Sequence, residues 1–154
     1  MAARTESVCK FICERGGWSV TNLQLQKLLY LAQMTYMGRH EGKKLFDGFF
    51  EAWDYGPVEP SVYRKVRMFG SNPISDVFFD ARVFDETDDR HKFLVEICQE
   101  LLPKRAGDLV EITHWDGGAW AKYYVPGIRG IEIPDRDITR EYADRIGGGT
   151  LTEH

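Results

Sequence analysis

The fold of this chain is decided by the stretch Leu25-Gln26-Lys27-Leu28-Leu29-Tyr30. Just before it, Thr21 and Gln24 have the spacing of a capping box, in which each side chain bonds the other residue's backbone amide. Apolar residues then recur at helical spacing and cover more of the surface than a solvent-facing helix needs, until Gly38 offers a stop. We therefore predict a central, largely buried helix over Thr21–Gly38.

Shorter helices are predicted on both sides of this central helix. Each has apolar residues at intervals of three and four and is bounded by capping residues, prolines or glycines. The expected ranges are 5–15, 60–70, 87–103, 106–114, 119–124 and 134–142. The prediction is a mainly α fold: a compact single helical domain of about six to seven helices with at most a small β strand or hairpin element.

Three segments are expected to differ from this pattern. Phe49–Trp53 is too short to classify from its period, and we favour a helix there. Val77–Phe84 is rich in Phe and Val and alternates imperfectly, which indicates a strand or a small hairpin. Residues 147–154 begin with three consecutive glycines and have no apolar period. We therefore expect one domain over residues 1–146 and a flexible C-terminal tail over 147–154.

The composition is typical of a globular protein and does not favour binding to nucleic acid or insertion into a membrane. Of its 154 residues, 43% are hydrophobic and 29% are charged, and the formal net charge is −4. This charge gives no general attraction to phosphate backbones, which argues against nucleic acid as a partner. No stretch approaches the ~18 consecutive apolar residues of a membrane span, and the N-terminus lacks the apolar core of a signal peptide. We expect a cytoplasmic protein without a membrane partner.

The three cysteines, Cys9, Cys13 and Cys98, do not form a recognisable metal or disulfide framework. Their number is odd, and a cytoplasmic domain of this length does not need disulfides, so we expect reduced thiols. With a histidine they could in principle hold zinc, but a second closely spaced pair of ligands is missing. The glycine motifs of nucleotide-binding sites are also missing from the sequence. We expect neither a metal nor an organic cofactor.

The most enzyme-like segment is Thr113-His114-Trp115-Asp116, because a histidine near a carboxylate can act as a general base. However, no serine stands in a nucleophile elbow, and no cysteine belongs to a motif that pairs it with His114. The simpler interpretation is a structural histidine near a helix end, with Trp115 and Trp120 packed against the core. We therefore expect no catalytic residues, and a small hydrolase centred on His114 and Asp116 is the weaker alternative.

A candidate partner-binding surface combines rigid aromatic residues with arginines. Gly56-Pro57 forces a turn that can hold its aromatic neighbours in place, and the helix predicted after it carries a basic face. A solvated face is the simplest explanation of those charges, whereas aromatic residues beside arginine are enriched in interface hot spots. For Trp53 the alternative is a core anchor that fixes the turn. The predicted partner-binding residues are Trp53, Tyr55, Tyr63, Arg64 and Arg67.

The order of several short motifs resembles one protein family. The motifs are Leu25–Tyr30, Leu45-Phe46, Glu51–Trp53 followed by Tyr55–Val58, Val62-Tyr63, Thr113-His114 with Trp120, and Ile131–Tyr142. Together they resemble the landmarks of the Panacea, or SocA-like, antitoxin domain, a family also described as phage-associated proteins. The sequence departs from the family near Trp120, where the usual acidic residue and Pro-Trp are replaced by Asp116-Gly117-Gly118-Ala119-Trp120.

The resemblance implies a helical domain that works by protein contact and not by catalysis. Such a domain is the antitoxin of a type II toxin–antitoxin system, and it neutralises a cognate protein toxin encoded by an adjacent gene. Some family members are thought to present the toxin to a Clp-type protease. A proteolytic adaptor or a phage or mobile-element regulator is therefore the alternative that the resemblance leaves open.

Overall fold

The centre of the fold is a long buried helix, α2 (Asn22–Arg39), in a computed structural model that describes residues 1–147. The expected capping box is confirmed, because Gln24 N donates to Thr21 Oγ1 at 3.3 Å and Thr21 N donates to Gln24 Oε1 at 2.9 Å. Every residue from Leu25 to Thr35 is buried, as expected for a central helix. Gly38, however, does not end the helix. It is the point where the ring of Tyr142 crosses α2 so closely that a Cβ would collide with it.

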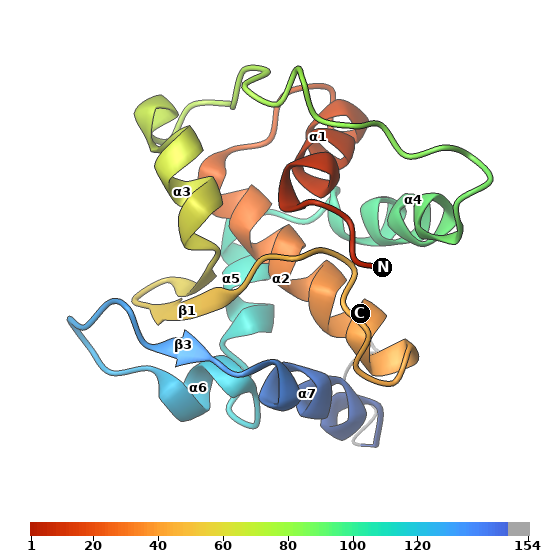
Figure 1. Ribbon diagram of the computed structural model, residues 1–154. Coiled ribbons are helices and arrows are strands. Elements are labelled where there is room, and N and C mark those ends of the chain that lie inside the picture. The colour runs from red at the N-terminus through yellow and green to blue at the C-terminus, as the bar shows by residue number, and fades with distance from the viewer. Residues whose placement is uncertain (148–154) are drawn as a thin grey trace.

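The other helices surround α2, which confirms the predicted mainly α fold (Figure 1). Helices α1, α3, α4, α5 and α7 each contact α2 directly, and α6 packs on α7. Their bounds are α1 (Thr5–Arg15), α3 (Pro60–Val66) with the 3₁₀ turn η1 (Arg67–Phe69), α4 (Asp89–Leu101), α5 (Ala106–Thr113), α6 (Ala119–Tyr123) and α7 (Asp135–Gly147). Helix α7 thus runs beyond the predicted end and includes Gly147. Residues 148–154 of the predicted tail lie outside the described residues.

A small antiparallel sheet lies beside the helices, and it corrects two predictions. Its order is β2-β1-β3, with β1 (Phe50–Trp53), β2 (Gly56–Val58) and β3 (Glu132–Ile133). The helix favoured over Phe49–Trp53 was wrong: the segment pairs on both edges, and its burial alternates as in a strand. The strand expected over Val77–Phe84 was also wrong. That segment is a loop of turns that buries Phe78 and Phe84 while Phe79 and Val83 remain exposed.

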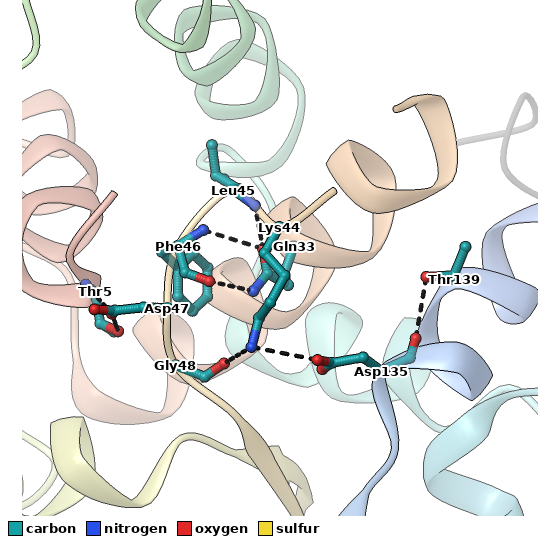
Figure 2. Close-up of polar contacts among 9 residues, drawn as sticks. All are labelled: Thr5, Gln33, Lys44, Leu45, Phe46, Asp47, Gly48, Asp135 and Thr139. Atoms are coloured by element: carbon teal, nitrogen blue, oxygen red, sulfur yellow. Dashed lines mark hydrogen bonds and ion pairs between the residues drawn. The ribbon is translucent and has the colours of Figure 1, made fainter. Parts of the chain in front are cut away.

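The segment between α2 and β1 is held in place by Gln33, a buried polar residue of α2 (Figure 2). Its amide nitrogen donates to the carbonyl of Phe46 at 2.8 Å, and its carbonyl accepts from the Leu45 amide, also at 2.8 Å. Lys44 next to this pair donates to the Gly48 carbonyl at 2.7 Å and forms an ion pair with Asp135 of α7 at 3.3 Å. These contacts fix the chain as it enters β1.

No helix in residues 1–147 is both long enough and apolar enough to span a bilayer.

Candidate partner-binding groove

An open groove lies between the start of α2, the β1–β2 hairpin and α3. Its volume is about 580 Å³. Three of the predicted partner-binding residues, Trp53, Tyr55 and Tyr63, line it together with Lys27 and Arg129. Figure 1 shows how the β1 end of the hairpin and the long loop before β3 extend on one side of the molecule. The groove therefore joins segments that are far apart in the sequence.

The hairpin that presents Tyr55 has a tight turn, because Trp53 pairs directly with Gly56 across it. Gly56 has φ +110°, a conformation that a residue with a side chain rarely adopts. A Cβ at Gly56 would also lie 2.9 Å from Thr113 Oγ1. The turn leaves the Tyr55 side chain 72% exposed at the rim of the groove. The glycine is thus required both by the backbone and by the close packing beneath it.

Contacts from the C-terminal third of the chain keep the hairpin in position. Trp120 Nε1 donates to the carbonyl of Trp53 at 2.7 Å. The carboxylate of Asp54 accepts from the Tyr124 hydroxyl at 2.6 Å and from the Gly127 amide at 3.3 Å. The hydrogen bond from Tyr124 is the main reason that the pKa of Asp54 is lowered, so this carboxyl remains ionised.

An aromatic pair with an arginine over it forms one wall of the groove. The rings of Trp53 and Tyr63 meet edge to face, with centroids 4.7 Å apart. The guanidinium of Arg129 lies 4.1 Å from the Trp53 centroid and 5.8 Å from that of Tyr63. These are cation–π distances. Sequence reasoning missed Arg129, because nothing in its neighbourhood along the chain predicts contact with residues of β1 and α3.

Lys27 is a buried cation behind the same groove. It is 0% exposed, and its Nζ donates to the carbonyl of Pro57 at 2.9 Å. Burial lowers the pKa of Lys27 to about 7, since a charged ammonium is costly away from water. Among residues 1–147, no carboxylate lies within ion-pair distance of this ammonium. Sequence reasoning placed Lys27 only within a helical motif, because a lysine there is normally solvent-exposed.

The structure separates the two predicted arginines from the aromatic residues. Arg64 on α3 and Arg67 in η1 are both exposed, and neither lines the groove that contains Tyr63. Between them, Lys65 forms an ion pair with Glu6 of α1 at 3.0 Å. The basic face of α3 therefore borders the groove without forming its wall.

His114 is packed against Trp120. Its ring stacks on Trp120 with centroids 3.8 Å apart and an interplanar angle of 8°. Burial, followed by the charge of Lys27, lowers the pKa of His114, although the backbone of Tyr55 acts in the opposite direction. In the described part of the chain, Nε2 of His114 has no hydrogen-bond partner. The stacking supports the structural interpretation of this histidine.

A buried ion pair that the sequence analysis missed lies beneath α6. Glu141 Oε2 accepts from Nε of Arg145 at 2.8 Å, and both residues are buried. The other oxygen, Oε1, accepts from the Tyr30 hydroxyl at 2.6 Å and from the Ala119 amide at 2.9 Å. Glu141 and Arg145 are four positions apart on α7, a spacing that is equally common for ion pairs on a helix surface. Only the packing of α7 on α2 shows that this ion pair is buried.

The cysteines lie inside the protein as free thiols. Burial raises the pKa of Cys13 to about 12 and that of Cys98 to about 11, so both remain protonated at neutral pH. Within residues 1–147 there is no group of three or more metal-ligating side chains.

Comparison with known proteins places the chain in a family. Residues 25–121 match the family described as "Antitoxin SocA-like, Panacea domain". Antitoxin SocA of Caulobacter vibrioides (strain NA1000 / CB15N) is 33% identical over an alignment of 110 residues, and the match covers 66% of this chain and 58% of that protein. No solved structure matches the chain significantly. The protein belongs to the SocA-like Panacea antitoxin family. The matched segment includes Lys27 and the aromatic pair of the groove but ends before Arg129.

Proposed function

We propose that this protein is the antitoxin of a type II toxin–antitoxin system and neutralises its cognate toxin by direct binding. Membership of the SocA-like family supports the antitoxin role. The observation that carries direct binding is the groove lined by Trp53, Tyr55 and Tyr63. Large aromatic side chains that are already held in place lose little conformational freedom on binding, which is why they dominate many protein interfaces.

In this proposal the protein acts stoichiometrically in the cytoplasm, without a catalytic residue, metal or cofactor. The partner is a protein toxin encoded by an adjacent gene. The toxin covers the groove and is blocked while it stays bound. Arg64 and Arg67, which border the groove, contribute charge at the rim of the same interface.

The proposal is tested by expressing this chain together with the product of the neighbouring gene from separate promoters. The expected result is growth arrest by the neighbour alone, rescue by this protein, and co-purification of the two chains. Tyr55→Ala should weaken binding by roughly 10-fold or more, as expected for an interface hot spot. Phe79→Ala is the matched control, because Phe79 is 73% exposed but lies in a loop away from the groove.

The lifetime of the toxin separates blocking from presentation to a Clp-type protease. Toxin synthesis is stopped while the antitoxin is present, and toxin levels are followed in cells with and without the protease. Blocking predicts the same toxin level in both strains together with full rescue. Rescue that disappears in the protease-deficient strain would show that the chain is an adaptor instead.

A further inference from the structure

Arg129 is held in place but has unused hydrogen-bond donors. Its guanidinium lies over the rings of Trp53 and Tyr63, which restricts its position. Within residues 1–147 it forms neither an ion pair nor a side-chain hydrogen bond. A guanidinium presents N–H donors in a planar fork that matches a carboxylate. Arg129 is therefore a preorganised carboxylate-binding group at the side of the groove.

The charge of the groove points to the same kind of partner. Arg129 is the exposed cation of its lining, with Lys27 buried behind it, and Asp54 is the one acidic residue among the described lining residues. The charge of Arg129 is a minor contributor to the lowered pKa of Asp54. Asp54 already accepts hydrogen bonds from Tyr124 and Gly127. The protein as a whole has a formal net charge of −4, so Arg129 is an exposed cation against an acidic background. An incoming carboxylate would gain from the exposed guanidinium of Arg129, and an incoming lysine or arginine would be repelled by it.

Apolar surface lies beside these charges. Tyr55 is largely exposed at the rim, and the loop that carries Arg129 also exposes Val125 and Ile128. Asp54 ties this loop to the hairpin through its bonds to Tyr124 and Gly127. Arg129 itself is exposed, so a chain can run past it along the groove rather than end there. These features suit an extended segment that carries an acidic side chain next to an apolar one.

We propose that the groove binds a segment of the toxin in which an aspartate or glutamate side chain pairs with Arg129 while a neighbouring apolar residue packs on Tyr55. This inference rests on the proposed antitoxin function and specifies the chemistry of its partner. Arg129 lies beyond residues 25–121, the segment that matches the family. Arg129 thus helps to select which toxin the protein binds.

The test uses the full-length protein and the toxin from the neighbouring gene. Arg129→Gln should weaken binding about 10-fold to 100-fold, as expected for a lost charge-assisted hydrogen bond, with an unchanged melting temperature. Arg129→Lys keeps the charge but loses the fork, so we expect a smaller loss. Arg82→Gln is the control, because Arg82 is an exposed arginine that does not line the groove.

The bound segment is found with an array of overlapping peptides that covers the toxin sequence. The expected spots contain an acidic residue beside an apolar one and lose their signal when Asp or Glu is changed to Asn or Gln. Arg129→Glu alone should lose binding. If binding returns when the acidic residue of the toxin segment is also changed to lysine, the ion pair between Arg129 and that residue is established. Binding by Arg129→Gln at wild-type affinity, or signal only from the free C-terminal carboxylate of the toxin, would overturn this inference alone. Failure of the wild-type protein to bind or rescue would overturn the proposed function as well.

Discussion

The indole of Trp120 donates a hydrogen bond of 2.7 Å to the carbonyl of Trp53, which lies 67 residues earlier in the chain. One face of the same indole stacks on His114, and the ring also stacks on Tyr124. Trp120 therefore connects α6 to the last residue of β1 by direct contact. The position of the groove depends on this connection, because Trp53 carries both the bonded carbonyl and the ring beneath Arg129.

Truncation of the buried face of α2 should destabilise the whole domain. Leu28 is 1% exposed, so Leu28→Ala removes apolar contacts and leaves a cavity at a cost of about 2–5 kcal/mol. Leu23→Ala on the same helix is the control, because Leu23 is 38% exposed. Thermal or urea unfolding measures both variants. Equal stability of the two variants would contradict the central position of α2.

Lys27 should make the stability of the protein depend on pH. Its folded pKa of about 7 lies below the ordinary lysine value of 10.5, so between these pH values the unfolded chain binds the additional proton. The free energy of unfolding should therefore rise with pH, by up to about 1.4 kcal/mol per unit. The thiols, whose pKa values are raised, act in the opposite sense from about pH 8 upward, where unfolded cysteines begin to lose protons.

Urea unfolding of wild type and Lys27→Met between about pH 7 and 8 isolates this contribution, because His114, with its lowered pKa, titrates mainly below that window and the unfolded thiols mainly above it. Lys27→Met should abolish the increase of the unfolding free energy with pH, whatever the substitution does to the absolute stability. If the unfolding free energy changes with pH by the same slope in wild type and Lys27→Met, Lys27 keeps a normal pKa in the folded protein.

Charge reversal on α3 and η1 tests whether the border of the groove contacts the toxin. Arg64→Glu with Arg67→Glu should leave the melting temperature nearly unchanged, since exposed charges contribute under ~1 kcal/mol to folding. The double variant should nevertheless weaken toxin binding and growth rescue. Lys43→Glu with Arg82→Glu is the matched control at exposed positions elsewhere. Unaltered toxin affinity in the first double variant would place the interface away from this face.

His114 should contribute to folding and not to chemistry. His114→Phe preserves a ring that can stack on Trp120 and removes both nitrogens, so growth rescue should be retained. His114→Ala removes the stacked ring, and rescue should fall only in proportion to the folded fraction seen by circular dichroism. A well-folded His114→Phe protein without any rescue would instead favour a catalytic role or a direct toxin contact for the imidazole.

The helices could be predicted from the sequence because their signals are local. The capping box of Thr21 and Gln24 and the apolar period after it lie within one helix and need no distant partner. The hairpin could not be predicted in this way, because four residues of β1 define no period and the pairing with Ile133 comes from a segment more than 80 positions later. Strand formation there is a tertiary effect.

The groove was predicted only in part, for the same physical reason. Trp53, Tyr55 and Tyr63 stand close together in the sequence, so their proximity could be inferred. The turn itself is formed by Asp54 and Tyr55, whereas Gly56 and Pro57, which were expected to form it, belong to β2. Arg129 reaches them from a loop after α6, and its cation–π contact exists only in the folded chain. Arg64 and Arg67 are near Tyr63 in the sequence but lie outside the groove lining, and their contact with a partner stays a prediction.

The long separation between Lys27 and Arg129 has a consequence for protein synthesis. A ribosome must translate past Arg129 before the groove has all its walls, because α6 and the loop after it follow the other lining segments in the sequence. A nascent chain that ends before Trp120 still contains the aromatic pair but lacks the hydrogen bond that positions it. We therefore expect prematurely terminated products to bind no toxin, so that only completed chains count toward protection of the cell.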